Sequence, residues 1–123
     1  MHKKIRLEYS FSSSVKILYS RLSTASGLSE WFADDVYQNE NRFVFVWQGS
    51  ESCALLKEHK HNSFVRFHWE DADDEYFEFR VEEDPLTKDV ALIITDVVEE
   101  DEEEEAKELW DKQIESLHRA LGA

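Results

Sequence analysis

Residues 90–121 read VALIITDVVEEDEEEEAKELWDKQIESLHRAL. The first part, residues 90–98, is the most hydrophobic segment of the chain and predicts a strand. Seven consecutive carboxylates follow at residues 99–105. Beyond them, a set of largely apolar residues recurs at steps of three and four, which predicts a strongly amphipathic helix over residues 106–121. The set is Ala106, Leu109, Trp110, Gln113, Ile114, Leu117 and Leu121. This order favours an α+β domain that ends in a long helix.

The N-terminal part begins with a second strand pattern. Apolar and polar residues alternate over residues 5–11, the period of two that is typical of a strand with one buried face. The three serines at residues 12–14 can cap a helix, and apolar spacing over residues 15–22 predicts that helix. Residues 23–27 are expected to break it. A short second helix is expected to carry Leu28, Trp31 and Phe32 on one face, before Asp34 and Asp35 turn the chain.

The middle of the chain predicts two pairs of strands. Residues 42–47 and 53–59 are expected to form a hairpin whose turn occupies residues 48–52. Alternation then predicts strands over residues 65–69 and 77–81, separated by an acidic turn at residues 71–75. With residues 5–11 and 90–98, the sheet is expected to contain about six strands. Because we find no internal repeat and no change of composition, we expect one domain over residues 1–123.

The net charge and the lengths of the apolar runs exclude some classes of binding partner. The chain has 123 residues, with 28 acidic and 14 basic side chains, which gives a net charge of −14. A phosphate backbone would be repelled, so nucleic-acid binding is not expected. The longest apolar runs, residues 43–47 and 90–94, are too short to span a bilayer. A single cysteine and an N-terminus interrupted by charges predict a cytoplasmic protein without an internal disulfide.

Three stretches resemble a known family. Residues 19–32, YSRLSTASGLSEWF, are similar to that family's helix followed by a leucine and a Trp-Phe pair. Residues 64–69, FVRFHW, resemble its strand ending in tryptophan, and the leucines and Trp110 of residues 109–121 resemble its closing helix. The family is the START-like, or Bet v 1-like (SRPBCC), superfamily, in the branch related to the C-terminal domain of Aha1. The resemblance implies a helix-grip fold, in which a curved antiparallel sheet wraps around the last helix.

The resemblance also implies a cavity between the sheet and the last helix, which in many relatives holds an apolar ligand. Ligand pockets are mostly apolar, so the residues expected to line this cavity are large inward-facing side chains. They are Phe45, Trp47, Val65, Phe67, Trp69, Phe77, Phe79, Trp110, Ile114 and Leu117. The competing interpretation is a filled core, because protein interiors are closely packed and these side chains are bulky.

Other residue patterns could in principle form a metal site or a catalytic site. His59 and His61 have the spacing of a metal-binding pair on a strand, with Glu58 or His68 as a third ligand, but the exposed end of a hairpin is the favoured interpretation. No metal or cofactor is therefore expected. Cys53 is interpreted as a small buried residue rather than a nucleophile. Catalysis would require an ionisable group inside the cavity, and His68 and Glu78, the first candidates, face outward by alternation.

Two functions remain open from the sequence. The leading prediction is non-enzymatic binding of a hydrophobic or amphipathic small molecule or lipid between the sheet and the helix of residues 106–121. The alternative is a co-chaperone-like interaction module that uses an acidic surface, such as residues 99–105, to bind a basic protein. The competing structural interpretation is that the acidic run is a solvated segment leading into the N-terminus of the helix, where carboxylates complement the helix dipole.

Overall fold

The computed structural model describes residues 1–72 and 74–122, and its main element is one curved antiparallel sheet of seven strands. The strands follow the order β1-β7-β6-β5-β4-β3-β2 across the sheet. Their bounds are β1 His2–Phe11, β2 Asp35–Asn39, β3 Arg42–Trp47, β4 Ser50–Lys60, β5 Phe64–Trp69, β6 Tyr76–Glu83 and β7 Val90–Glu99. The first and last predicted strands therefore pair with each other, and β1 and β2 form the two edges.

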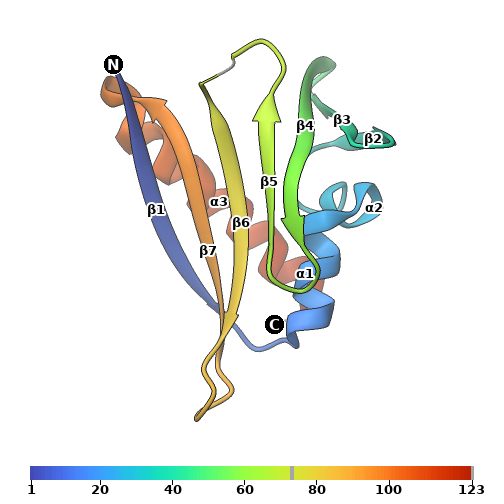
Figure 1. Cartoon of the computed structure of the whole chain (residues 1–123), viewed down its shortest axis with the longest axis vertical. Coiled ribbons are helices and arrows are strands. Elements are labelled where there is room, and N and C mark those ends of the chain that lie inside the picture. The colour runs from blue at the N-terminus through green and yellow to red at the C-terminus, as the bar shows by residue number, and fades with distance from the viewer. Residues whose placement is uncertain (73, 123) are drawn as a thin grey trace.

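The helices lie on one side of this sheet. They are α1 Val15–Ser23, α2 Ala25–Leu28, the short 3₁₀ helix η1 Glu100–Glu102, and α3 Glu103–Leu121. Figure 1 shows α3 running behind the sheet, which curves around it, with α1 and α2 beside the β4 end. The predicted helix-grip architecture is thus confirmed in its main features, the curved antiparallel sheet and the long C-terminal helix.

Alternation along the strands explains which face is buried. In β6, Phe77, Phe79 and Val81 point to the helix side, while in α3 the buried residues are Trp110, Ile114 and Leu117. Five phenylalanines from β3, β5 and β6 are almost fully buried and form the aromatic centre of the core. They are Phe43, Phe45, Phe67, Phe77 and Phe79. Ring contacts join them, including a stacked pair of Phe67 and Phe77 with centroids 5.0 Å apart.

The prediction of about six strands was one too few. Residues 34–35 do not simply turn the chain, because β2 begins at Asp35 and pairs with β3 from Asp35↔Val46 to Asn39↔Arg42. Only Val36 of this strand is buried. A polar edge strand has almost no hydrophobic pattern to reveal it, and such polarity also protects a free edge from pairing with another chain.

Two other boundaries differ from the predictions. The turn between β3 and β4 contains only Gln48 and Gly49, rather than residues 48–52, and both have positive φ angles of 50° and 83°. Two such residues are what the tight turns of twisted hairpins require. Helix α2 ends at Leu28, so Trp31 and Phe32 lie in the following turns and not on the helix.

The acidic run is divided among three elements. Its first residue ends β7, the next three form η1, and Glu103 to Glu105 make the first turn of α3. Three carboxylates in the first turn of a helix are favourable, because they lie next to the partial positive charge of its N-terminus. At the other end, Gly122 takes the left-handed conformation with a φ of 68° and closes the helix. No helix in residues 1–72 and 74–122 is long and apolar enough to cross a membrane.

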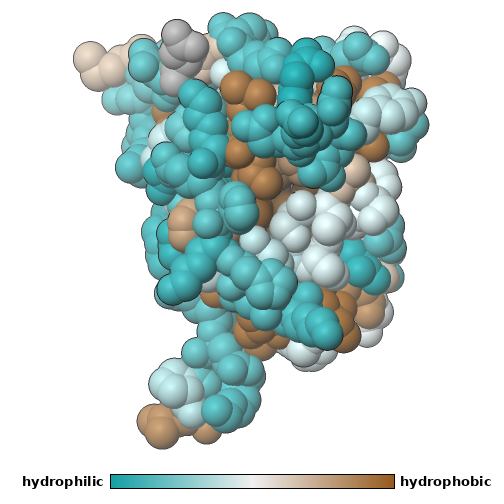
Figure 2. Space-filling model, turned by 45° about the vertical axis from the view of Figure 1, so that its right-hand side comes forward, coloured by the Kyte–Doolittle hydropathy of each residue, from teal (hydrophilic) through white to brown (hydrophobic). Residues whose placement is uncertain are grey.

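The surface is mostly hydrophilic on the face that Figure 2 shows. Hydrophobic side chains gather there in a narrow strip in the upper half of the view, between hydrophilic neighbours. The hairpin between β6 and β7 protrudes at the bottom of Figures 1 and 2. Leu86 lies in that hairpin and is 90% exposed. The polar surface agrees with the net charge of −14.

Candidate functional site

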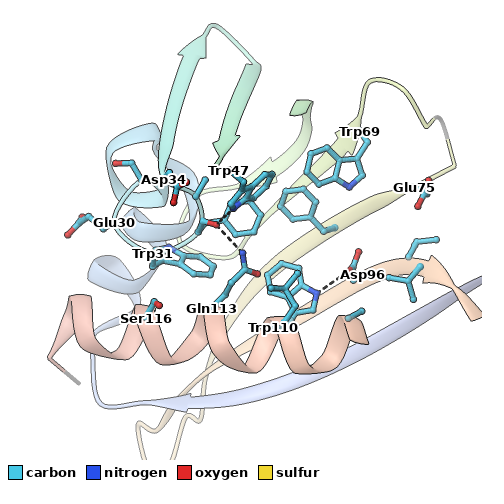
Figure 3. A pocket seen from close by; sticks show the side chains of 18 residues that line it. Glu30, Trp31, Asp34, Trp47, Trp69, Glu75, Asp96, Trp110, Gln113 and Ser116 are labelled. Atoms are coloured by element: carbon cyan, nitrogen blue, oxygen red, sulfur yellow. Dashed lines mark hydrogen bonds between the residues drawn. The ribbon is translucent and has the colours of Figure 1, made fainter. Parts of the chain in front are cut away.

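A cleft of about 840 Å³ lies between the inner face of the sheet and α3. Its walls come from the segment after α2, the ends of β3, β5 and β7, the start of β6, and α3 from Ala106 to Ser116 (Figure 3). All four tryptophans of the chain line it: Trp31, Trp47, Trp69 and Trp110. Phe32, Phe77 and Leu109 add further apolar surface. The volume falls within the range of about 300–1,000 Å³ that is usual for small-molecule sites.

Hydrogen bonds fix the orientation of three of these indoles. Trp31 Nε1 donates to the carbonyl of Arg21 at 2.8 Å, which ties the segment after α2 back to α1. Trp47 Nε1 donates to the carbonyl of Phe32 at 2.8 Å. Trp110 Nε1 donates to the carboxylate of Asp96 at 2.8 Å. With its polar atom held by the protein, each of these indoles is kept in place as part of the cleft wall.

The carbonyl of Phe32 connects three parts of the fold. In addition to Trp47 from β3, it accepts a hydrogen bond of 3.0 Å from Gln113 Nε2, which comes from α3 (Figure 3). The Phe32 ring is buried and lies against Trp110, with centroids 5.8 Å apart in a stacked arrangement. Gln113 and Phe32 therefore connect the helix to the sheet side at one end of the cleft.

Asp96 is an ionisable group on the cleft wall, in the middle of the most hydrophobic strand. Its Cα partners in the neighbouring strands are Ile5 and Phe77, both buried. Burial raises the pKa of Asp96 to about 6, although the hydrogen bond from Trp110 favours the charged carboxylate. A carboxyl group with such a pKa can change its charge slightly below neutral pH.

Three more carboxylates line the cleft nearer to solvent. Glu30 forms an ion pair of 3.0 Å with Arg21, and Glu75 lies 3.9 Å from the imidazole of His2. Asp34 accepts a hydrogen bond of 2.7 Å from the backbone N–H of Gln48. The lining residues thus combine apolar rings with carboxylates.

The ten predicted cavity residues separate into two groups. Trp47, Trp69, Phe77 and Trp110 line the cleft. The other six lie in the packed core outside the cleft: Phe45, Val65, Phe67, Phe79, Ile114 and Leu117. Their rings and methyl groups fill the space between the sheet and the side of α3 that carries Ile114 and Leu117. The cleft therefore occupies only part of the sheet–helix interface and borders this packed core.

Several lining residues were missed by the sequence predictions. Asp96 lies on the same face as Val90, Leu92 and Ile94, so the period of two in β7 already placed it inward. Gln113 was assigned to the apolar stripe of the helix, and its hydrogen bond to Phe32 shows why a polar residue is suitable there. Glu30, Asp34 and Glu75 were not indicated by any periodic pattern, because Glu30 lies on a turn and the other two lie just before strands β2 and β6.

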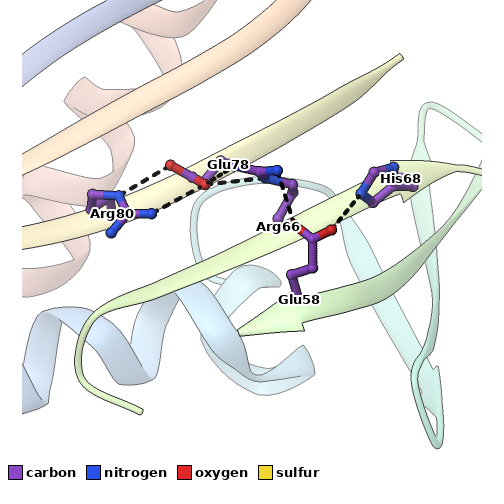
Figure 4. A network of polar contacts seen from close by, with 5 residues as sticks. All are labelled: Glu58, Arg66, His68, Glu78 and Arg80. Atoms are coloured by element: carbon purple, nitrogen blue, oxygen red, sulfur yellow. Dashed lines mark hydrogen bonds and ion pairs between the residues drawn. The ribbon is translucent and has the colours of Figure 1, made fainter. Parts of the chain in front are cut away.

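His68 and Glu78, the first candidates for catalysis, lie on the outer face of the sheet, away from the cleft. Glu78 is only 5% exposed and accepts hydrogen bonds from Arg66 and Arg80 (Figure 4). Burial alone would raise the pKa of Glu78, but the two guanidinium groups outweigh it, and its pKa lies below the ordinary value. The pKa of His68 is lowered by burial, and Glu58 lies 4.0 Å from its Nε2. This network joins three neighbouring strands.

The candidate nucleophile and the candidate metal ligands, Cys53, His59 and His61, lie outside the cleft. Cys53 is half-buried, and its sulfur accepts a hydrogen bond of 3.1 Å from Arg42. His61 follows the end of β4 and contacts the ring of Tyr19, with centroids 5.5 Å apart. His59 is exposed near the end of the same strand. Among residues 1–72 and 74–122, no three His, Cys, Asp or Glu side chains are grouped so that they could hold a metal ion.

Comparison with known proteins places this geometry in a family. A family model described as a START-like superfamily domain matches residues 1–123. No match was found among the curated proteins. A protein of Bacteroides fragilis solved by NMR shares 40% sequence identity, with a TM-score of 0.70 over 98% of this chain and 91% of that chain.

Two further solved structures share the fold at lower identity. The Aha1 dimer from Colwellia psychrerythraea has 18% identity and a TM-score of 0.82 over 97% of this chain and 96% of that chain. The AHSA1-like protein from Aeromonas hydrophila has 12% identity and a TM-score of 0.76 over 98% of this chain and 92% of that chain. The match over the whole chain, together with the sheet wrapped around α3, shows that this protein belongs to the START-like superfamily.

Proposed function

We propose that this protein binds a small amphipathic molecule in the cleft between the sheet and α3. The observation that carries the proposal is the cleft itself, which has a volume of about 840 Å³ and is lined by all four tryptophans. Apolar rings provide affinity by removing apolar ligand surface from water. A few polar groups then orient the ligand, and here those groups are the carboxylates and Gln113.

The wall residues favour binding over a passive gap in the core. Three indole N–H groups are held by the protein, so the rings need not reorganise when a ligand enters. Members of the START-like superfamily often bind ligands, which supports the same interpretation. The packed core beside the cleft is filled by the side chains of the protein itself.

The test uses the tryptophans as reporters. In a ¹H–¹⁵N spectrum the protein gives four indole signals, and all four side chains line the cleft. Addition of a neutral amphipathic dye such as Nile red is expected to shift these signals and to increase the fluorescence of the dye. Trp69→Ala should weaken binding on the order of tenfold, because it removes a large wall of the cleft.

The matched control is Tyr37→Ala. Tyr37 is an exposed aromatic residue of β2 that does not line the cleft, so its removal should leave dye binding unchanged. Equal losses in the two variants, with native far-ultraviolet spectra, would contradict a site in the cleft. A discrete small molecule that copurifies in native mass spectrometry and leaves on denaturation would supply the chemical identity of the ligand.

The second candidate function is recognition of a basic protein. It is favoured by one observation, the exposed carboxylates of Glu100, Asp101, Glu102, Glu104 and Glu105 around the start of α3. Part of the acidic run is paired within the chain, since Glu103 contacts both Lys3 and Lys107. Replacement of the five exposed carboxylates by Gln or Asn should abolish binding of a basic protein such as cytochrome c, and should leave dye binding in the cleft intact.

A further inference from the structure

The charged side chains that line the cleft, among the described residues, are all acidic. Four carboxylates line it, and none of the 14 lysine and arginine residues of the chain is among the described residues that do so. The histidines, too, are absent from its described lining. A neutral ligand would gain nothing from this distribution, and an anionic ligand would be repelled by it.

The aromatic walls of the cleft also favour a cationic ligand. The four tryptophans come from different parts of the chain, and Figure 3 shows Trp47 and Trp69 on the sheet side and Trp110 on α3. The face of an indole attracts ammonium and guanidinium groups, and tryptophan is the best of the aromatic residues in this respect. Aromatic rings combined with carboxylates are the usual means of holding an organic cation.

Asp96 is the carboxylate placed to anchor such a group. Its side chain accepts the indole N–H of Trp110 at 2.8 Å and forms no ion pair within the described part of the chain. Asp34 likewise has a backbone N–H as its partner and no cation among the described residues. Glu30 and Glu75 differ, because Arg21 and His2 lie near them. Two of the four carboxylates therefore retain an uncompensated charge.

We propose that the ligand of this cleft is an amphipathic organic cation, with an ammonium or amidinium group at Asp96 and an apolar body on Trp47 and Trp69. This inference rests on the proposed function and specifies the ligand class. The cleft would select the ligand by charge, and the net charge of −14 would speed its approach.

The protonation state of Asp96 should make binding of the cation depend on pH. Burial raises its pKa to about 6, so the carboxylate is mainly charged at neutral pH and accepts a proton below that value. The side chains that face it are Ile5 from β1, Phe77 from β6 and Trp110 from α3, and Glu75 is the nearby charged group. Binding of the cation should therefore weaken as the pH falls from 7 to 5.

The experiment compares three probes with one apolar body: 2-naphthylmethylamine, 2-naphthalenemethanol and 2-naphthoate. Each is titrated into the full chain at pH 7, with the four indole signals as the readout. The ammonium probe is expected to bind on the order of tenfold more tightly than the alcohol, and the carboxylate probe more weakly than both. Asp96→Asn should remove most of the preference of the ammonium over the alcohol, while binding of the alcohol persists.

The control variant is Glu82→Gln. Glu82 is exposed on β6 and does not line the cleft. Its replacement by Gln therefore removes one negative charge, as Asp96→Asn does, but at a position away from the site. It should leave the preference for the ammonium probe intact. Equal binding of the ammonium and the alcohol would overturn the cationic ligand class and leave the proposed function standing. Loss of the preference in Glu82→Gln as well would assign it to net charge and overturn the role of Asp96. Failure of all three probes to bind would overturn both proposals.

Discussion

Two carboxylates of this protein, the half-buried Asp96 and the buried Glu78, show how the surroundings of a carboxyl group decide its charge. Asp96 lies between apolar strand neighbours, with an indole N–H as its side-chain partner, and burial raises its pKa to about 6. Glu78 is more deeply buried, but Arg66 and Arg80 lie against it, and its pKa falls below the ordinary value. The first group opposes folding when charged, and the second supports it.

The free energy of unfolding of Asp96→Asn, relative to that of the wild type, is therefore expected to increase as the pH rises. The folded protein holds the Asp96 proton more tightly than the unfolded chain, whose ordinary pKa is 3.8. The stabilising contribution of protonated Asp96 is complete below about pH 4 and is lost as the pH rises through about 6. Between pH 4 and 8, the free energy of unfolding of the variant should gain on the order of 2 kcal/mol relative to the wild type. Urea unfolding at both pH values measures this difference.

Trp110→Phe provides an independent check on the same group. It removes the indole N–H that favours the charged carboxylate, so the pKa of Asp96, followed by carboxyl ¹³C NMR, should rise further. A stability difference between Asp96→Asn and wild type that does not change with pH would contradict the assignment.

Glu78→Gln should have the opposite pH behaviour. The lowered pKa means that the stabilisation is present above the ordinary value of 4.5 and is lost as the pH falls through the folded-state value. At pH 7 the variant should lose roughly 1–3 kcal/mol, because Arg66 and Arg80 lose a charged partner on the outer face of the sheet. Below pH 4 the difference should shrink.

Glu82→Gln is the matched control for this variant. Glu82 lies on the same strand and is exposed, so its replacement should change the free energy of unfolding by less than about 0.5 kcal/mol at pH 7. Chemical denaturation of the two variants in parallel gives the comparison. Equal effects would mean that the buried network on the outer face does not contribute.

At the scale of elements, the junction of α1 and α2 determines where one wall of the cleft lies. Gly27 donates its N–H to Thr24, and Leu28 beside it is fully buried. Trp31, three residues further on, donates to the carbonyl of Arg21 in α1. The close approach of the two helices thus places an indole of the cleft.

Gly27→Ala is expected to disturb that junction. An added Cβ would lie 2.4 Å from the carbonyl oxygen of Ser20 and 2.7 Å from Cα of Arg21, both of which are backbone atoms. The backbone must shift to admit the methyl group, at a cost of roughly 1–3 kcal/mol in the free energy of unfolding. The indole signal of Trp31 should move as well. Ser26→Ala, on the exposed side of the same short helix, should leave both quantities nearly unchanged, and a similar loss there would contradict the steric argument.

The elements that the sequence predicted are those with a strong hydrophobic period. Residues 42–47 were predicted with the bounds of β3, and α3 differs only by the three glutamates at its start. Strand β2 was missed because one buried side chain, Val36, gives no period. The cleft was only partly predicted for a related reason. Periodicity identifies inward-facing residues, whereas the boundary between cleft and packed core depends on how the rings of Phe45, Phe67 and Phe79 fill space.

At the scale of the whole molecule, the net charge of −14 opposes the compact state. The ion pairs at the surface compensate only locally. Lys3 and Lys107 both contact Glu103, which lowers the pKa of that carboxyl group to about 2, and the N-terminal amine contacts Glu99. Around them, the other acidic residues of this region remain exposed: Glu100, Asp101, Glu102, Glu104 and Glu105. Long-range repulsion among carboxylates should therefore outweigh these local attractions.

Added salt should stabilise this protein at neutral pH. Screening weakens repulsion between exposed charges once the Debye length falls to about 10 Å near 0.1 M ionic strength. The Tm at pH 7 is thus expected to rise when NaCl is increased from about 10 to about 200 mM. A gain of about 1 kcal/mol in the free energy of unfolding would correspond to roughly 3–6 °C for a chain of this length. Differential scanning calorimetry measures the shift. The same series near pH 4.6, the isoelectric point, serves as the control, because the net charge is close to zero there and the effect should vanish. A Tm that falls with salt at pH 7 would mean that ion pairs such as Lys3–Glu103 outweigh the repulsion, since screening would then remove a net attraction.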